Sequence, residues 1–433
     1  MKLFGRNRRY SNELTAEHNG EQVSLAGWVH EKRDLGGLFF LLVRDREGLA
    51  QVTLHKREVD RELFEQARKV PRESVVAIEG IIKGEQKAPG GYEILPNRIE
   101  VLSVASYDLP LDPTGKVGAE LDTRLDARFM DLRTERTKHI FMIRSQVLSA
   151  IRGFLSDRGF IEINTPKIVS AATEGGTALF PISYFEREAF LNQSPQLYKQ
   201  MLIASGFDKV FEIAPIFRAE EHDTTKHLNE AMSVDIEVAF VSAEEVMRIL
   251  EELIAFVYSK VAFYPGLDSL NIQLEVPKIP FRRIRYGEAI ELLADAGEPI
   301  EWGDDLSSSA EHKLGAQIGE HYFITEWPRA IKPFYAQPIE GKETSNAFDL
   351  MHPRLELASG SQRVHSYELL KQNIESKGLS AVSFAFYLDA FRYGMPPHAG
   401  WGLGAERLLM SMLGIENIRE VILFPRDRRR LVP

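Results

Sequence analysis

The sequence predicts an α+β protein with two parts, a small β barrel at the N-terminus and a larger domain in which helices pack on an antiparallel sheet. The first hundred or so residues hold short runs of β-branched and aromatic residues separated by glycine-containing turns. Beyond about residue 135, strand-like and helix-like stretches mix without the regular alternation that a parallel sheet requires. At 433 residues the chain is also too long for one ordinary core.

The N-terminal part, residues 1–105, contains five predicted strands. Glycine-containing turns at 36–37, 47–48 and 89–91 separate most of them. Five short strands in such a length suit a small closed barrel such as the OB-fold, one face of which binds oligonucleotides. A barrel with only a structural role remains the alternative. The predicted strands are residues 23–29, 38–43, 50–54, 74–82 and 93–101.

Residues 106–135 are charged, contain Pro110 and Pro113 and show weak periodicity, which is typical of a hinge. The second domain is expected to cover residues 136–433. Residues 160–165 alternate like a strand that ends at Pro166. Two helices are predicted by apolar residues at helical spacing: Ile140, Ile143, Val147, Ile151 and Phe154, and then Val246, Ile249, Leu250, Leu253 and Val257.

The composition is that of a globular protein, with 44% hydrophobic and 27% charged residues. No apolar stretch is long enough to span a membrane, and the N-terminus lacks the apolar segment of a secretory signal. The absence of cysteine excludes disulfides and thiolate metal sites. We therefore expect a cytoplasmic protein without a membrane partner.

The net charge of −10 argues mildly against a general nucleic-acid binder. It does not exclude one, because phosphate contacts need only local basic patches. The C-terminus supplies such a patch, although a solvated charged tail explains it equally well. Its arginines are Arg426, Arg428, Arg429 and Arg430.

Residues 211–240 carry the first chemical signal. An apolar strand leads to Arg218 and Glu220, a polar loop holds His222, Lys226 and His227, and a second alternating strand follows. A hairpin with such a charged tip can present cations to a polyphosphate, and an arginine can grip two oxygens at once. A surface hairpin with scattered charges is the alternative, but it does not explain why an arginine and a glutamate share one strand face.

Residues 394–413 carry the second signal. Gly400, Gly402 and Gly404 lead into Ala405, Glu406 and Arg407 and then into an apolar helix. Glycines allow a close approach of the backbone to a ligand, and an arginine at a helix start can meet a phosphate. Alone the pattern is weak, since glycine-rich strand ends are common.

Taken together, these segments resemble the class II aminoacyl-tRNA synthetases. FRAE at 217–220 and HLNE at 227–230 look like motif 2, GLGAER at 402–407 looks like motif 3, and GFIEINTPKI at 159–168 looks like motif 1 at the dimer interface. The likeness is greatest to the aspartyl enzymes of the archaeal type and covers the whole chain, barrel included. Its further markers are TEGG at 173–176, QSPQLYKQ at 193–200, FDL at 348–350 and FPRDRRRL at 424–431.

The resemblance implies a catalytic ATP and Mg²⁺ site. Arg218 is expected to hold the α-phosphate and the reacting carboxylate, and Arg407 the γ-phosphate and the adenine face. The Mg²⁺ ligands match Glu356 and Ser359, with Asp349 close by, and oxygen ligands suit this ion. The full set expected around ATP is Arg218, Ala219, Glu220, Lys226, His227, Leu228, Glu356, Gly404, Ala405, Glu406 and Arg407.

The resemblance also implies an aspartate pocket, in which Lys199 and Arg363 bind the side-chain carboxylate. A neutral amide there would leave buried cations unpaired, at a cost of roughly 3–5 kcal/mol, so aspartate is expected over asparagine. Ser361 and Val364 depart from the family pattern, where a glycine and a glutamate stand. The residues matching the pocket are Glu174, Gln196, Leu197, Tyr198, Lys199, Arg218, Ser359 and Arg363.

For tRNA, the resemblance places anticodon contacts at Phe40, Gln51 and Glu79 of the barrel. Enzymes that reject tRNA(Asn) carry a tryptophan and a lysine where this chain has His30 and Pro89. Proline has no backbone donor and no charge, and histidine offers less stacking area than tryptophan. We therefore expect both tRNA(Asp) and tRNA(Asn) to be charged with aspartate, the second for later conversion by an amidotransferase.

The resemblance thus implies an aspartate–tRNA ligase that forms aspartyl-adenylate, AMP and pyrophosphate and acts as a homodimer. Three alternatives differ in kind. An asparaginyl enzyme would prefer the amide, a non-catalytic RNA-binding relative would lack a motif arginine or the Mg²⁺ carboxylate, and a free-standing asparagine synthetase would lack the barrel. Residues 280–320 carry no functional signal that we recognise in the sequence.

Overall fold

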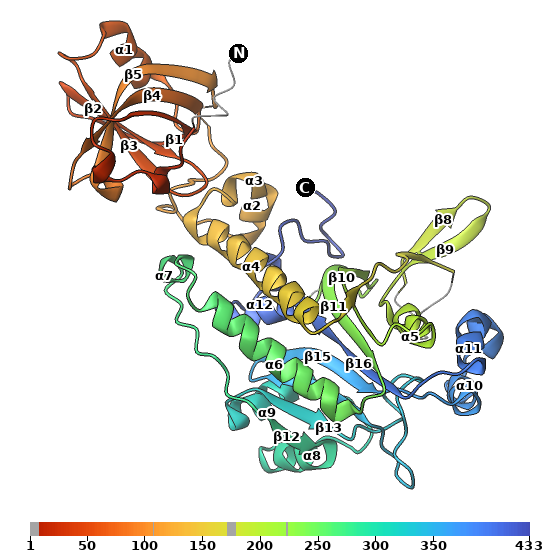
Figure 1. Cartoon of the computed structure of the whole chain (residues 1–433). Helices are drawn as coiled ribbons and strands as arrows, with labels where there is room; N and C mark the ends of the chain where they lie inside the picture. The colour runs from red at the N-terminus through yellow and green to blue at the C-terminus, as the bar shows by residue number, and fades with distance from the viewer. Residues whose placement is uncertain (1–7, 107, 171–178, 222–223) are drawn as a thin grey trace. The chain divides into compact units, whose positions relative to one another are not determined.

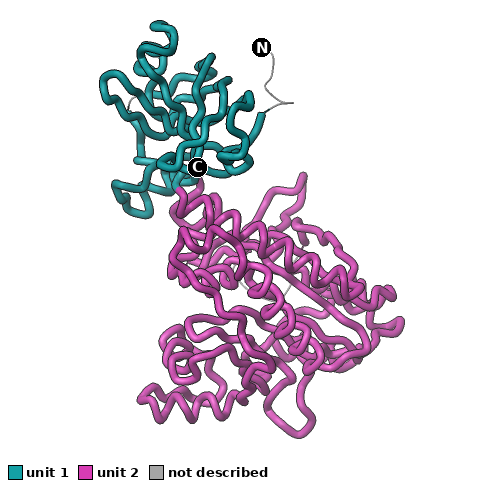
Figure 2. Tube along the Cα trace, turned by 60° about the vertical axis from the view of Figure 1, so that its left-hand side comes forward, with its two compact units in different colours: residues 1–134 teal, residues 135–433 magenta. Residues whose placement is uncertain are grey.

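The computed structural model describes residues 8–106, 108–170, 179–221 and 224–433. The chain forms two compact units, Met1–Thr134 and Glu135–Pro433, which are coloured separately in Figure 2. Each unit is described by itself below.

The first unit is built on the closed barrel that the sequence predicts. Its strands follow the order β1-β2-β3-β5-β4, and β1 closes the barrel by pairing with β4, Gln22 opposite Ile81. The helix α1 (Arg61–Lys69) covers the barrel core, where the rings of Phe64 and Phe39 meet edge to face. The strands are β1 (Gln22–Asp34), β2 (Leu38–Arg44), β3 (Leu49–His55), β4 (Val75–Gly84) and β5 (Tyr92–Ser103), and the short 3-10 turns are η1 (Ser11–Glu13), η2 (Ala16–His18) and η3 (Pro89–Gly91).

The stretch predicted as a hinge contains two short helices, α2 (Leu121–Asp126) and α3 (Arg128–Asp131), and both belong to the first unit. They are held by buried charges: Asp131 pairs with Arg128 and, at 2.9 Å, with Arg124. Because ion pairs replace much of an apolar stripe here, the sequence shows little helical periodicity.

The second unit is built on a large, mainly antiparallel sheet (Figure 1), as the sequence predicts. Its order is β12-β13-β14-β15-β16-β11-β10-β6, and only the outermost pairs, β12 with β13 and β6 with β10, run parallel. A small second sheet has the order β7-β9-β8. The strands are β6 (Ile161–Glu162), β7 (Ile168–Val169), β8 (Pro181–Tyr184), β9 (Arg187–Leu191), β10 (Lys209–Phe217), β11 (Glu230–Ala239), β12 (Arg282–Arg285), β13 (Tyr322–Thr325), β14 (Ala347–His352), β15 (Leu355–Gln362) and β16 (His398–Gly404).

Two long helices, α4 (Glu135–Asp157) and α6 (Ala243–Val261), pack side by side and share the core under the sheet (Figure 1). The apolar faces predicted for both are buried, except that Ile249 is only partly so. No helix in the described ranges is long and apolar enough to cross a bilayer. The others are α5 (Gln196–Ala204), α7 (Gly266–Ser269), α8 (Tyr286–Asp295), α9 (Ser308–Ile318), α10 (Tyr367–Ser376), α11 (Ala385–Arg392), α12 (Ala405–Leu413), η4 (Ala381–Phe384) and η5 (Ile418–Glu420).

The strand expected over residues 160–165 is shorter than predicted, because only β6 joins the sheet. The backbone N–H of Thr165 donates to Glu212 at 2.7 Å, and its hydroxyl donates to the same carboxylate at 2.8 Å. A side chain thus satisfies the donor that a longer strand would have used.

Candidate active site

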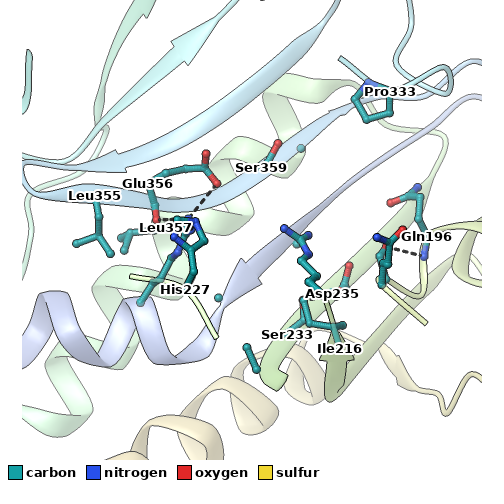
Figure 3. A pocket seen from close by; sticks show the side chains of 18 of the residues that line it. Gln196, Ile216, His227, Ser233, Asp235, Pro333, Leu355, Glu356, Leu357 and Ser359 are labelled. Carbon is teal, nitrogen blue, oxygen red and sulfur yellow. Dashed lines mark hydrogen bonds and ion pairs between the residues drawn. The ribbon is translucent and has the colours of Figure 1, made fainter. Parts of the chain in front are cut away.

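A cavity of about 520 Å³ opens on the sheet of the second unit. Segments far apart in the sequence meet there, among them β10, β11, β15, β16 and α9. Figure 3 shows two ends: His227 and Glu356 lie at one, and Gln196 and Asp235 at the other. The predicted residues that line the cavity are Gln196, Arg218, Glu220, Lys226, His227, Leu228, Glu356, Ser359, Arg363, Gly404, Glu406 and Arg407.

The hairpin of β10 and β11 delivers the first arginine. The strands pair in register up to Phe217 opposite Glu230, and the Arg218 N–H then donates to the Asn229 carbonyl at 2.9 Å. The Arg218 side chain is 47% exposed and has one long ion pair, 4.0 Å to Glu220. Its guanidinium therefore faces the cavity with donors to spare.

The turn from β16 into α12 delivers the second arginine. Arg407 Nη1 donates to the Glu356 carbonyl at 3.2 Å and lies 3.5 Å from its carboxylate, and Nη2 lies 3.2 Å from His227 Nε2. Burial, together with the charge of Arg407, lowers the pKa of His227. The imidazole is thus neutral and accepts the hydrogen bond from Arg407.

The neighbouring Glu406 is buried and joins three elements. Its carboxylate accepts from Arg144 of α4 and from the Met232 N–H of β11, both at 2.9 Å. This anchor fixes the first turn of α12 and hence the position of Arg407 in the cavity.

The oxygen ligands predicted for Mg²⁺ come from β14 and β15. Asp349 stands opposite Ser359 in the strand register, so the two share a face of the sheet. Asp349 is buried and binds Lys332 at 2.6 Å. Burial raises the pKa of Asp349 to about 6 despite Lys332.

This donor set fits a hard divalent cation, because the Glu356 carboxylate and the Ser359 hydroxyl both line the cavity and the Asp349 carboxylate stands opposite Ser359 in the strand register. No group of three or more acidic or histidine side chains arranged to hold a metal occurs among the described residues. An ion there would need further oxygens from a bound phosphate or from water.

A wall of the cavity that the sequence did not reveal comes from residues 305–311, within the stretch for which we saw no functional signal. Asp305, Leu306, Ser308 and Glu311 line it. Burial, with the nearby charge of Glu356, raises the pKa of Glu311 to about 7. The only local signal in the sequence is the Ser307 cap of α9, which predicts a helix start and not a site.

At the other end of the cavity, every guanidinium nitrogen of Arg363 donates a hydrogen bond to a neighbouring side chain. Its Nε donates to Glu237 at 2.9 Å, Nη1 to the Ser361 hydroxyl at 2.8 Å, and Nη2 to Gln196 and Glu237 at 3.3 Å each. The guanidinium also lies 5.2 Å from the Tyr335 ring. Burial pushes the pKa of Glu237 upward, but Arg363 and Lys199 outweigh it and leave the pKa below its ordinary value.

Two acidic residues of this end, Asp235 and Glu237, were missed by the sequence analysis. They alternate on β11 with buried Val234 and Ile236, so they face the cavity side of the sheet. Lys199 donates to Asp235 at 2.9 Å and lies 3.4 Å from Glu237. The sequence pattern that could have revealed both residues is the alternation of carboxylates with apolar residues along this strand.

Several predicted residues do not line the cavity. On α5, Gln196 and Lys199 share a face, whereas Leu197 is in a hydrophobic core cluster and Tyr198 lines a surface groove beside Phe386. A contiguous motif cannot all face one way on a helix.

Lys199 and Asp349 do not line the cavity either. Each contacts a residue that does: Lys199 donates to Asp235, and Asp349 accepts from Lys332. Ala219 and Ala405 are also outside the lining, and Glu174 and His222 lie outside the described residues.

The two departures from the family pattern have different surroundings. Ser361 lines the cavity and accepts from Arg363. Val364 is fully buried in a hydrophobic cluster and does not reach the cavity.

The barrel has a cavity of its own, of about 550 Å³, lined by Phe40, Gln51 and Pro89. Cationic side chains border it, among them Lys32, Arg33, Lys83 and Lys87. Glu79 is not part of the lining and lies 3.9 Å from Arg98.

His30 also lies apart from this cavity. Its Nδ1 is 2.6 Å from Arg44, whose guanidinium binds the buried carboxylate of Glu73 at 2.7 and 3.0 Å. The ring thus belongs to a polar cluster inside the first unit and does not face the groove that Phe40 and Pro89 share.

Comparisons with known proteins agree with this geometry. Residues 120–428 match the family described as tRNA synthetases class II (D, K and N), and residues 23–102 match an OB-fold nucleic acid binding domain. The chain is 60% identical to an aspartate–tRNA(Asp/Asn) ligase of Archaeoglobus fulgidus, over 98% of this chain and 100% of that one.

Two solved structures share the whole architecture. An asparaginyl-tRNA synthetase from Pyrococcus horikoshii, complexed with asparaginyl-adenylate, has a TM-score of 0.94 and 34% identity, covering 99% of this chain and 100% of that one. An aspartyl-tRNA synthetase from Entamoeba histolytica has a TM-score of 0.89 and 34% identity, covering 100% and 94%. The barrel is thus an OB-fold and the second unit a class II synthetase domain, and the chain belongs to the class II tRNA synthetase family.

Proposed function

We propose that the chain activates L-aspartate with ATP and transfers it to tRNA(Asp) and tRNA(Asn). The observation that carries the proposal is the single cavity in which Arg218 and Arg407 stand at one end and Arg363 at the other. The 60% identical relative named for aspartate and for both tRNAs supports the choice of substrates. The reaction would take place in the cytoplasm, where tRNA and ATP occur together.

The activation step requires positioning and charge but no protein nucleophile. The α-carboxylate of aspartate attacks the α-phosphorus of ATP, and pyrophosphate leaves with its electron pair. Arg218, whose half-exposed side chain lines the cavity, would hold the carboxylate and the α-phosphate in line, and Arg407 would hold the leaving phosphates. The terminal ribose hydroxyl of tRNA then attacks the aspartyl-adenylate and releases AMP.

Mg²⁺ is the metal that this donor set fits, with Glu356 and Ser359 as its proposed protein ligands. When bound, the ion would neutralise charge on the phosphates. Asp349, which pairs with Lys332 and shares a sheet face with Ser359, is placed to orient that hydroxyl. Arg407 contacts both the carbonyl and the carboxylate of Glu356, and thereby keeps the carboxylate at the phosphate end.

The preference for aspartate over asparagine comes from the hydrogen-bond donors of Arg363. It does not come from a buried cation that an amide ligand would leave unpaired. Arg363 and Lys199 already have Glu237 and Asp235 as counter-charges, so the sequence-based argument that an amide would strand two buried cations does not apply. Guanidinium groups only donate, however, and a carboxylate only accepts. An amide would direct its own N–H₂ donors at Arg363 or would have to turn its single carbonyl toward it.

The groove of the barrel would receive the anticodon, with Phe40 stacking a base and Gln51 pairing with a base edge. Pro89 lines the same groove and offers neither charge nor backbone donor, which supports tolerance of either third anticodon base. His30 does not line this groove, because its ring binds inside the polar cluster with Arg44.

The proposal extends to a homodimer formed through the helix α4 and the following segment, residues 159–168, which resembles motif 1 and contains β6. Exposed Ile161 and Ile168 lie in this segment and are suited to an apolar interface. Aspartate attached to tRNA(Asn) would require a separate amidotransferase to become asparagine.

The decisive experiment is ATP–pyrophosphate exchange with aspartate and with asparagine, followed by aminoacylation of both purified tRNAs. We expect exchange with aspartate and Mg²⁺ only, and charging of both tRNAs with similar kcat/KM. Exchange with asparagine alone would identify an asparaginyl enzyme. A preference for tRNA(Asp) of about a hundredfold or more would contradict the relaxed tRNA specificity.

A further inference from the structure

The helix α9 is docked directly on the turn that leads into the phosphate end of the cavity. Gly315 of α9 has no side chain, and a Cβ there would lie 2.1 Å from the Pro353 carbonyl oxygen. Pro353 and Arg354 form the turn between β14 and β15, just before Glu356. Glu311 lies four residues before Gly315, about one turn away on the same side of α9, so this close backbone contact holds Glu311 against the cavity.

Glu311 faces the loop of the β10–β11 hairpin. Its carboxylate lies 3.8 Å from the ammonium group of Lys226, and the same ammonium donates to the Arg354 carbonyl at 3.1 Å. Both side chains are largely buried, at 24% and 18% exposure. Lys226 is therefore held between α9 and the β14–β15 turn, next to the contact of His227 with Arg407.

We infer that Glu311 is a positioning residue for the nucleotide: it holds Lys226, and through it the hairpin loop, over the phosphates of ATP. This inference rests on the proposed function. A lysine has a long flexible stem and loses much rotamer freedom when it is fixed. A carboxylate that lines a site for phosphates repels this negatively charged ligand. The presence of Glu311 is therefore explained by its contact with Lys226.

The geometry leaves Lys226 able to bind phosphate while it is held. An ammonium group has three donors, and Arg354 takes one of them. The long 3.8 Å separation from Glu311 confines the head group without a short hydrogen bond. The remaining donors stay available on the cavity side, which both residues line.

The test is Glu311→Gln, which keeps the size and removes the charge, measured at about pH 8.5, where a carboxyl with a pKa of about 7 is ionised. We expect the KM for ATP in pyrophosphate exchange to rise about tenfold, the KM for aspartate to stay within about twofold, and the melting temperature to stay unchanged. Glu311→Asp should recover part of the loss. The matched control is Glu320→Gln, an exposed glutamate just beyond the same helix, which should behave as wild type.

A double-mutant cycle with Lys226→Met separates positioning from a simple charge effect. If Glu311 acts through Lys226, the double variant should bind ATP no more weakly than the worse single variant. Effects that multiply would overturn the inference, as would wild-type ATP affinity of Glu311→Gln in calorimetry with Mg²⁺. Calorimetry measures ATP binding without turnover. If the wild-type enzyme shows no aspartate-dependent exchange, the proposed function is refuted. The effect of Glu311 on ATP binding can still be measured in that case.

Discussion

The two ends of the cavity use charged side chains in opposite ways. At the amino-acid end, the side chains of Arg363 and Glu237 are at most 4% exposed, and each guanidinium nitrogen of Arg363 has a partner within 3.3 Å. At the nucleotide end, Arg218 is 47% exposed and Glu356 33% exposed, and their ion pairs are long, 4.0 and 3.5 Å. The amino-acid end is therefore complete before a ligand arrives, whereas the nucleotide end is completed by the ligand.

This difference separates the contributions to folding from the contributions to catalysis. Buried, fully paired charges are costly to break because the partner stays behind in a medium that solvates it poorly. Half-exposed cations contribute little to folding but gain strength when a phosphate excludes water around them. Variants at the two ends should accordingly fail in different assays.

The largest effect is expected at the nucleotide end. Arg218→Ala should reduce pyrophosphate exchange by about 10³-fold, because a cation that holds both reacting groups is lost. The free energy of unfolding should change by less than about 0.5 kcal/mol, since the side chain is 47% exposed and its ion pair with Glu220 is long, 4.0 Å. Exchange kinetics and urea unfolding on the same preparation measure both, and exchange close to wild type would remove Arg218 from the reaction.

The next effect concerns the amino-acid end. Glu237→Gln should lower the free energy of unfolding by about 3–5 kcal/mol, because Arg363 loses its counter-charge inside the protein. Urea denaturation followed by circular dichroism measures it. Glu356→Gln is the matched control from the other end, and an equal loss of stability in that variant would break the comparison.

The pH dependence of protein stability tests the role of the buried Glu237 carboxylate further. The pKa of Glu237 in the folded protein lies below its ordinary value of 4.5, so its ionised form contributes stability at higher pH. This contribution is present in full above 4.5 and is lost as the pH falls through the folded-state pKa. The stability difference between wild type and Glu237→Gln should therefore shrink on acidification below 4.5, and a difference that grows instead would show that the carboxylate is protonated in the native state.

The smallest effect is expected in the barrel, which belongs to a different unit from the cavity proposed for adenylation. Phe40→Ala should raise the KM for tRNA about tenfold, the loss typical of one base-stacking contact, and leave pyrophosphate exchange unchanged. Phe39→Ala is not a suitable control because that ring is buried in the barrel core. Exposed Leu35 serves better, and Leu35→Ala should charge tRNA as wild type does.

The fold was largely predictable from the sequence because most strands and helices follow simple periodicity. The five barrel strands and the apolar faces of α4 and α6 are examples. The helices α2 and α3 were not predictable in this way, since Arg128 and Asp131 take buried positions that apolar residues usually occupy. Periodicity of hydrophobic residues cannot reveal an element that is held by ion pairs.

The sequence motifs around Arg218 and Arg407 predicted residues that line one cavity, although Ala219 and Ala405 of the same motifs are outside the lining. Prediction failed on α5, where helical geometry turns Leu197 and Tyr198 away from Gln196. It also missed Glu311, since nothing near that residue in the sequence indicates that α9 is docked beside Lys226. Such contacts between distant segments become visible only in three dimensions.

Gly400 limits how the pocket can be redesigned for other amino acids. A Cβ at this position would lie 2.3 Å from the Ile236 carbonyl oxygen and 2.4 Å from the Glu237 carboxylate. Any larger residue would displace Glu237 and release Arg363 from its place. A mutant library for directed evolution toward a new amino acid should therefore keep Gly400 fixed and vary Ser361 and Gln196, whose side chains line the cavity and contact Arg363.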